Sequence, residues 1–181
     1  CGRERRRISF SQLARERADM EGLWADLAAG RIDLVASDHA PWPPESKSKP
    51  DIFENGSGAP GVQTLVPLLY SEGVAKGRIS LGRFVEVLSR NVARIFDLPP
   101  TKGELRPGAD ADLVLFDPKK RWVVRDEQML SHARWSPFEG MTVQGAVVAT
   151  VVRGVFAYRD GELLAKPGDG QFVPGAAPGT A

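Results

Sequence analysis

The sequence predicts an α/β fold whose first part combines helices with a buried strand and whose second part is mostly β. Two observations lead to this expectation. Apolar residues recur at helical spacing over residues 20–27, and a short, mostly apolar run follows at 32–36. After Leu98-Pro99-Pro100 the pattern changes to short apolar runs bounded by turn residues. Because a helix followed by a buried strand forms half of an α/β unit, we expect a parallel sheet covered by helices in the first part.

Composition narrows the class of protein. The chain has 181 residues, of which 42% are hydrophobic and 26% charged, as in a folded globular protein. Its formal net charge of +1 provides no global field for nucleic acid or an anionic membrane, which favours a small-molecule partner. The single cysteine, Cys1, excludes a disulfide framework and fits a reducing compartment, so we expect a cytoplasmic protein. No apolar run approaches the roughly 20 residues of a membrane-spanning helix.

The first 18 residues are basic, with arginines outnumbering glutamates. Such a segment is either a phosphate-binding arm or a solvated leader. We favour a disordered leader, because no aromatic or glycine pattern accompanies the charge. A helix is then expected from Asp19 to a stop near Gly30, followed by the strand at 32–36. The apolar stripe of this helix consists of Met20, Leu23, Trp24 and Leu27.

A long loop at 42–61 comes next, followed by two helices. The loop is rich in proline and charge and carries glycines near its end. A loop of this length inside a compact domain is usually functional or disordered. Helical spacing resumes over 62–73 and again over 81–96.

The second part is predicted to contain strands. Short strands are expected at 112–118 and 121–124, and residues 147–158 form one arm of a hairpin. That hairpin turns at Arg159-Asp160-Gly161 into residues 162–164. We therefore divide the chain into a basic leader (1–18), an α/β part (19–98), a β part (99–165) and a flexible tail (166–181).

Asp38 and His39 are the first candidates for chemistry, because they directly follow the expected strand. Polar residues in that position lie at the carboxyl edge of a sheet, where α/β folds place their active sites. Asp38 can bind a metal or act as a general base, whereas the structural alternative is that it caps the next segment while His39 bonds to backbone. The only other histidine, His132, lies beyond the change in pattern. A metal site built from this chain alone would therefore lack ligands.

The glycine-rich end of the loop, residues 56–61, is a second candidate. It matches neither nucleotide-binding glycine motif, so a phosphate cradle has little support. Glycines that let backbone N–H and C=O groups approach a ligand closely suit its position better. Trp42 and Phe53 are either walls of a pocket or loop packing.

Five blocks of the sequence, in order, resemble the C-terminal portion of a cyclic amidohydrolase, from the group of hydantoinases (dihydropyrimidinases), allantoinases and dihydroorotases. The blocks are Ile32-Asp-Leu-Val-Ala-Ser-Asp-His-Ala-Pro41; Ser57-Gly-Ala-Pro-Gly-Val62 with Leu68-Leu-Tyr-Ser-Glu-Gly-Val74; Gly77-Arg-Ile-Ser-Leu81 through Ala93-Arg-Ile-Phe96; Lys102-Gly-Glu-Leu-Arg-Pro-Gly-Ala-Asp-Ala-Asp-Leu-Val-Leu-Phe-Asp-Pro118; and Ser136-Pro-Phe-Glu-Gly140 with Val152-Arg-Gly154.

The resemblance implies the C-terminal fragment of a metal-dependent (β/α)8 TIM barrel plus strands of a small β-sandwich. Residues 19–98 would supply the last barrel strand, the active-site loop and the closing helices. It also implies a longer, homo-oligomeric enzyme that holds one or two divalent metals, Zn²⁺ in particular. The family's remaining metal ligands, a His-x-His, a carboxylated lysine and two further histidines, have no counterpart here, so we expect the isolated chain to be inactive.

The same resemblance assigns roles to individual residues. Asp38 would be a metal ligand and the catalytic base, with His39 beside the site. Ser57, Gly58, Asn55 and Trp42 would contact the substrate, a cyclic amide or ureide whose C–N bond is hydrolysed. Trp42 stands where dihydroorotases carry a histidine, which disfavours an orotate-like ligand, and other blocks lean towards hydantoinases. The competing hypothesis is a non-catalytic relic or assembly scaffold with the same fold.

Overall fold

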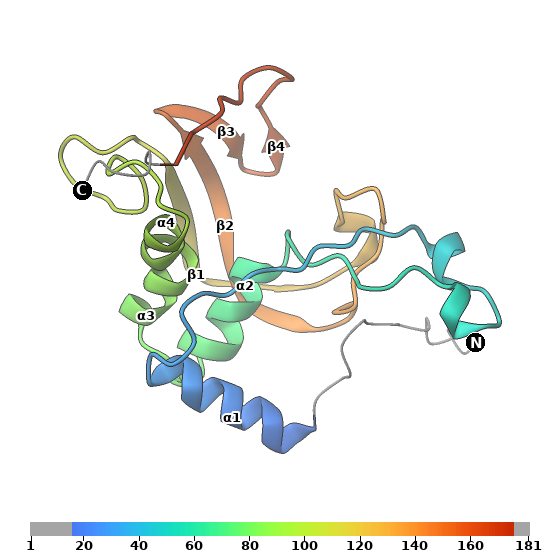
Figure 1. Cartoon of the computed structure of the whole chain (residues 1–181). Coiled ribbons are helices and arrows are strands. Elements are labelled where there is room, and N and C mark those ends of the chain that lie inside the picture. Colours follow the sequence, from blue (N-terminus) through green and yellow to red (C-terminus); the bar gives the residue numbers. More distant parts are fainter. Residues whose placement is uncertain (1–15, 176–181) are drawn as a thin grey trace.

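The structure, a computed structural model, describes residues 16–175 of the chain (Figure 1). Its α- and π-helices lie within residues 17–95 and its named strands within 113–163, with a 3-10 turn at Asp126–Gln128 between β1 and β2, so the predicted order of helices before strands is confirmed. The predicted leader lies outside the described residues up to position 15, and the tail does so from position 176.

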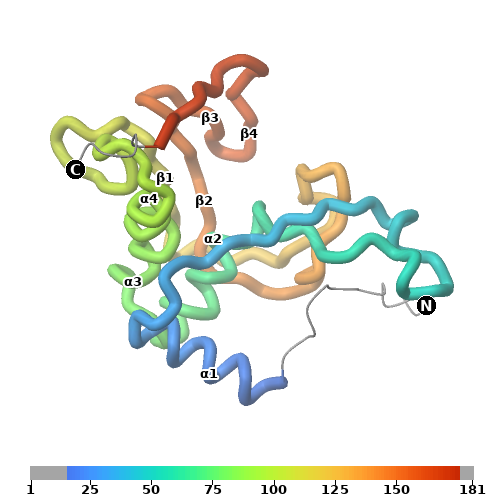
Figure 2. Tube along the Cα trace, in the orientation of Figure 1, coloured from blue at the N-terminus to red at the C-terminus, as the bar shows by residue number. Residues whose placement is uncertain are grey.

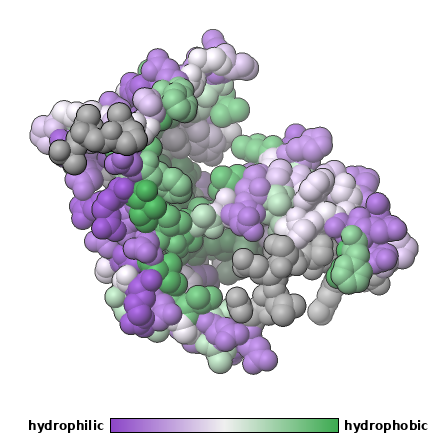
Figure 3. All heavy atoms as spheres, viewed as in Figure 1, coloured by the Kyte–Doolittle hydropathy of each residue, from purple (hydrophilic) through white to green (hydrophobic). Residues whose placement is uncertain are grey.

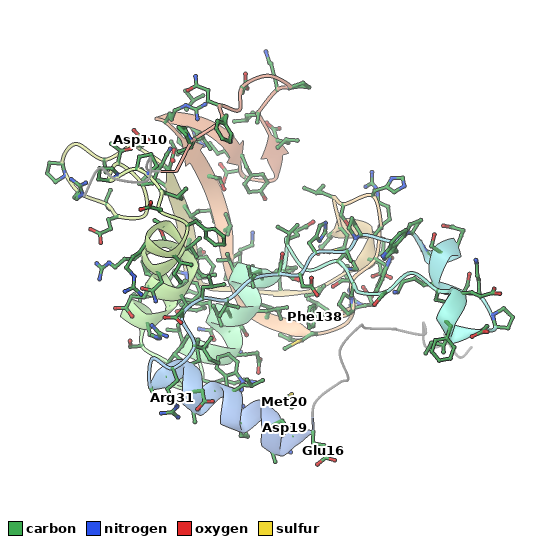
Figure 4. All side chains as sticks on the ribbon, in the orientation of Figure 1. Glu16, Asp19, Met20, Arg31, Asp110 and Phe138 are labelled. Carbon is green, nitrogen blue, oxygen red and sulfur yellow. The ribbon has the colours of Figure 1, made fainter. Side chains whose placement is uncertain are left out.

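Helix α1, Arg17–Ala28, confirms the first predicted helix and starts slightly earlier than expected. Figure 4 shows Glu16 and Asp19 together at its N-terminus, where the Glu16 N–H donates to Asp19 Oδ2 at 3.3 Å. This bond satisfies one of the backbone groups left over at a helix start. Within the apolar stripe Leu27 is buried, whereas Met20 and Leu23 remain about half exposed.

The strand predicted at 32–36 does not form. These residues run as coil beside the helices, because their backbone bonds go to helices instead of to a second strand. The Asn91 side chain donates to the Asp33 carbonyl at 2.8 Å, and Arg83 donates to the Ile32 carbonyl. Among residues 16–175, no named strand pairs with this segment. The sequence therefore predicted the apolar character of the run, and the prediction of a strand was wrong for lack of a partner.

Two longer helical segments follow, as predicted. The first combines α2, Leu65–Leu69, with the π-helical turn η3, Tyr70–Val74. The second combines α3, Leu81–Val85, the π-helical turn η4, Glu86–Arg90, and α4, Asn91–Ile95. The Ser80 hydroxyl caps α3 by accepting from the Arg83 N–H at 3.0 Å. These helices and α1 share a core made of Leu27, Leu69, Ile79, Phe84 and Val87.

The second part is a four-stranded antiparallel sheet in the order β1-β2-β3-β4. The strands are β1, Leu113–Val123; β2, Thr142–Val152; β3, Val155–Arg159; and β4, Glu162–Leu163. Two predictions need correction. The runs 112–118 and 121–124 join into one strand with an irregularity between Asp117 and Arg121. The arm 147–158 is broken at Arg153-Gly154, where φ angles of 47° and 82° make a tight hairpin turn. The turn predicted at 159–161 is confirmed.

An aromatic cluster joins the helices to the sheet. The ring centroids of Tyr70 and Phe116 are 4.7 Å apart, and Phe84 lies 5.9 Å from Tyr70. Gly145 on β2 has a φ of +94°, and a Cβ there would stand 2.5 Å from Phe116 and 2.7 Å from Tyr70. Position 145 therefore accepts only glycine, and the rings occupy the space of a side chain.

The surface differs between the two sides of the helical layer. On the face shown in Figure 3, hydrophilic side chains cover the outer edge over α3 and α4, and hydrophobic side chains gather towards the middle of the molecule. Within residues 16–175, no helix is both long and apolar enough to cross a bilayer.

Candidate functional site

The loop at residues 42–61 folds back against residues 37–41, which brings the predicted site residues together. Figure 2 shows the two segments side by side in the arm of the molecule that points away from α3 and α4. The Ala40 N–H donates to the Ala59 carbonyl at 3.0 Å, and His39 and Ala59 form an isolated parallel bridge. The fit is close, because a Cβ on Gly58 would stand 2.7 Å from the Ala40 Cβ. Asp38 and Trp42 thus share one small region with Ser57 and Gly58.

Asp38 has a strained backbone and an exposed side chain. Its φ of 44° lies in the left-handed region, which non-glycine residues adopt rarely and at some energetic cost. Within the part of the chain that the structure describes, no hydrogen bond or ion pair to the Asp38 carboxylate is found. A strained residue whose carboxylate is open can bind a cation or a proton, so its geometry suits the predicted chemistry.

His39 uses one ring nitrogen to hold the end of the loop. Its Nδ1 accepts the N–H of Gly61 at 3.0 Å and that of Val62 at 3.3 Å. Because Nδ1 acts as an acceptor, the neutral ring carries its proton on Nε2. The interpretation that His39 bonds to backbone is therefore confirmed, and the ring fixes the loop beside Asp38.

The Trp42 indole packs against Gly56, bonds to the glycine-rich end of the loop and remains 46% exposed. The indole Nε1–H donates to the Ser57 carbonyl at 2.8 Å. A Cβ on Gly56 would lie 2.6 Å from the indole ring, so Gly56 is required for this packing. Of the two aromatic residues considered as pocket walls or loop packing, Trp42 makes these contacts within the loop, whereas Phe53 is 94% exposed; contact of Trp42 with a substrate stays a prediction.

Asn55 and Lys47 are buried and organise the loop from within. The Asn55 amide accepts the Lys49 N–H at 3.0 Å and donates to the carbonyls of Lys49 and Asp51. Its polar atoms are thus engaged within the loop itself. Lys47 donates to the Gly56 carbonyl, and burial lowers the pKa of its ammonium group. Sequence reasoning missed Lys47, because a charged residue among prolines gives no signal of burial.

A hollow with a volume of about 350 Å³ adjoins the loop end. It is lined by His39, residues 60–64 and residues 129–131. The last of these come from the segment between β1 and β2, so a distant part of the chain contributes to the neighbourhood of His39. Such a concave, largely apolar space beside His39 suits part of a small ligand.

At this position the described residues offer Asp38 as a candidate metal ligand. Within 16–175 there is no group of three or more His, Cys, Asp or Glu side chains placed to hold a metal ion. Asp38 fits as a single oxygen ligand, and a zinc site normally takes three or four protein ligands.

Comparison with known proteins relates this geometry to a family. The family model described as "Amidohydrolase family" matches residues 6–157. The chain is 41% identical over 158 residues to a D-phenylhydantoinase of Escherichia coli O1:K1 / APEC, covering 86% of this chain and 34% of that protein. It is 43% identical over 153 residues to an L-hydantoinase of Paenarthrobacter aurescens, covering 83% and 33%. The chain thus spans about a third of the length of these relatives.

Solved structures lead to the same family. The L-hydantoinase (dihydropyrimidinase) from Arthrobacter aurescens matches with a TM-score of 0.86 and 40% identity, over 91% of this chain and 37% of that chain. The dihydropyrimidinase from Brevibacillus agri NCHU1002 matches with a TM-score of 0.80 and 36% identity, over 87% and 35%. These neighbours confirm the predicted fold class, part of a (β/α)8 barrel followed by strands of a β-sandwich.

Proposed function

The chain belongs to the amidohydrolase family, and on this premise we propose that the whole protein hydrolyses the C–N bond of a cyclic amide or ureide. Its relatives are named hydantoinases and dihydropyrimidinases, enzymes whose names denote ring substrates of this kind. The observation that carries the proposal is Asp38, whose exposed carboxylate and positive φ lie beside a glycine-rich loop. A non-catalytic scaffold with the same fold is the alternative.

Asp38 is the proposed base and one ligand of a divalent cation, for which we propose Zn²⁺. When bound, such a cation polarises the amide carbonyl and makes water more acidic. The Asp38 carboxylate accepts a proton from the water that attacks the carbonyl carbon. It then gives that proton to the ring nitrogen as the C–N bond breaks, so the carboxylate is restored at the end of the cycle.

The backbone at Ser57 and Gly58 is the proposed contact for the ring. Ser57 is exposed, whereas Gly58 is buried against Ala40 and has a φ of +93°, which glycine adopts freely. Trp42 fixes the Ser57 carbonyl, and the Asn55 amide shapes the loop from inside. A ring amide presents one donor beside one acceptor, which backbone N–H and C=O groups can match.

We propose a cytoplasmic, homo-oligomeric protein. The location is supported by the single cysteine of the chain, and the assembly by the resemblance to cyclic amidohydrolases. The division into a barrel part at 19–98 and a sandwich part at 99–165 belongs to the same proposal.

Replacement of Asp38 by Asn in the whole protein tests the function. We expect turnover of hydantoin, dihydrouracil or allantoin to fall by at least about 10²-fold, the low end of general-base effects. Asp33→Asn is the matched control, because Asp33 is an exposed carboxylate on the same segment whose ion-pair partner, Arg94, lies 3.9 Å away on the surface. That control should retain its activity.

Metal content provides the second measurement. The purified whole protein should hold a stoichiometric divalent metal after dialysis. An unmodified protein that holds no metal and turns over none of the three substrates would favour the scaffold, and near-full activity of Asp38→Asn would remove Asp38 from the mechanism.

A further inference from the structure

We propose that Trp135 is a positioning residue for the 42–61 loop, acting through Trp42 on the backbone that contacts the substrate. The link to substrate rests on the proposed function. The hydrogen bonds between Trp135 and the loop are independent of that function. It assigns a role in binding to the segment 128–135, which lies between β1 and β2 and far from the loop in sequence.

Two consecutive indole hydrogen bonds connect Trp135 to Ser57. Trp135 is only 1% exposed, and its Nε1–H donates to the Trp42 carbonyl at 2.8 Å. The Trp42 Nε1–H in turn donates to the Ser57 carbonyl at 2.8 Å. A buried donor that lost its acceptor would be costly, so Trp135 holds the start of the loop at a defined distance from the sheet.

The same segment also holds the other end of the loop. Gln63 lies two residues beyond the loop, and its amide Nε2 donates to the Gln128 carbonyl at 2.9 Å. Its Oε1 accepts the Leu130 N–H at 2.9 Å. Using both groups of one amide fixes the angle as well as the distance. The segment 128–135 is therefore hydrogen-bonded to Trp42 and to Gln63, which lie on either side of Ser57 and Gly58 in the sequence.

The expected consequence concerns substrate binding more than the chemical step. Loss of the hydrogen bonds at Trp42 or at Gln63 lets the Ser57–Gly58 backbone move relative to Asp38. This movement weakens the contacts to the substrate ring. Asp38 itself lies outside the loop and keeps its place in the 37–41 segment. Loss of contacts made equally in the ground state and the transition state raises KM and leaves kcat nearly unchanged.

The test compares Trp135→Phe with Trp122→Phe in the whole protein. Both changes remove an indole donor to a backbone carbonyl, because the Trp122 Nε1–H donates to the Gly145 carbonyl at 3.0 Å within the sheet. Hydrogen exchange followed by mass spectrometry of peptides covering 42–61 measures the loop without any substrate. We expect exchange to accelerate about tenfold in Trp135→Phe, the effect of one lost hydrogen bond, and to stay unchanged in Trp122→Phe. We also expect KM to rise about tenfold in Trp135→Phe while kcat changes less than about twofold.

Gln63→Met provides a second variant that does not disturb a buried ring. Gln63 is exposed, so this variant is expected to fold, and loop exchange should again accelerate. Unchanged loop exchange in both Trp135→Phe and Gln63→Met, or equal acceleration in Trp122→Phe, would overturn the proposal. A kcat loss as large as the KM rise would overturn it as well. Faster loop exchange in a protein without hydrolase activity would support the positioning of the loop by Trp135 while rejecting the proposed function.

Discussion

The antiparallel sheet at residues 113–163 and the extended segment at 32–41 satisfy their backbone in different ways. Each strand of the sheet pairs with a neighbouring strand, and β2 and β3 are joined by the short turn at Arg153-Gly154. The segment 32–41 instead forms hydrogen bonds with the helices. For example, the Val35 N–H donates to the Val87 carbonyl at 3.2 Å. Antiparallel strands can pair across a two-residue turn, whereas parallel strands need a crossover of a dozen residues or more. A short stretch of chain can therefore form a paired antiparallel hairpin more readily than it can supply a parallel strand with its partners.

The largest expected effect of this difference is on amide exchange in the 181-residue chain. Strand β2 pairs with β1 over 142–151 and with β3 over 149–152, whereas residues 32–38 have few backbone partners. We expect β2 to exchange at least about 10³-fold more slowly, as for core strands compared with locally opening segments. Hydrogen exchange with mass spectrometry measures both in one sample. Equal protection of the two segments would show that the helices hold 32–38 as firmly as strands would.

A smaller effect is expected where the extended segment meets the loop. Gly58→Ala places a Cβ 2.7 Å from the Ala40 Cβ, whereas Gly30→Ala, also at a positive φ, meets open space. Both variants carry the same backbone cost of about 1 kcal/mol, and only Gly58→Ala also pushes the loop away from 37–41. We expect KM of the whole protein to rise about tenfold for Gly58→Ala, the equivalent of about 1.4 kcal/mol in binding, and to be unchanged for Gly30→Ala. Identical KM values would argue against close packing of the two segments.

The smallest effect concerns the ion cluster that leads from the helices into the sheet. Lys102 Nζ lies 2.9 Å from Asp110 and 2.5 Å from Asp112, and Figure 4 labels Asp110 in this connection. Hydrogen bonds to Asp112 and Asp110 raise the pKa of Lys102, and the bond from Lys102 lowers the pKa of both carboxyl groups.

The sign of the pH dependence follows from these directions. The stability that the two carboxylates contribute to the folded state is present above their unfolded pKa. It is lost as the pH falls through their lower pKa in the folded state. The part due to Lys102 is lost as the pH rises through its raised pKa. Lys102→Met should therefore lower the melting temperature slightly between these limits and leave it unchanged at acidic pH. Lys76→Met, which removes the lysine of the ion pair with Glu72, is the control for the general effect of losing a lysine charge. A deficit that persists at acidic pH would mean that lost packing, and not charge, is responsible.

The sequence predicted elements whose causes are local. Helical spacing was enough for α1, and turn chemistry was enough for the hairpin at 159–161. The strand at 32–36 could not be predicted correctly, because an apolar run does not say whether a partner strand is present. The break at Arg153 was also missed, since arginine seldom takes a left-handed conformation.

In the candidate site, too, features with local causes could be predicted and contacts between distant residues could not. Asp38 and His39 were found because they follow an apolar run, and the backbone bonds of His39 were among the expectations. The contact between Trp135 and Trp42 joins residues 93 positions apart in sequence. No local pattern in a single sequence encodes such a pairing, so only the folded structure reveals it.

The aromatic cluster at Gly145 has a consequence for recombination between homologous genes. Tyr70 belongs to the helices and Gly145 to the sheet, and each has the shape that the other requires. A crossover in the connection between α4 and β1 would exchange one without the other. Any parental pair with a side chain at position 145 and a ring at position 70 would yield hybrids with a steric clash. Recombinants that survive selection should therefore inherit these two positions together, although the connection between them looks like a natural place to cut.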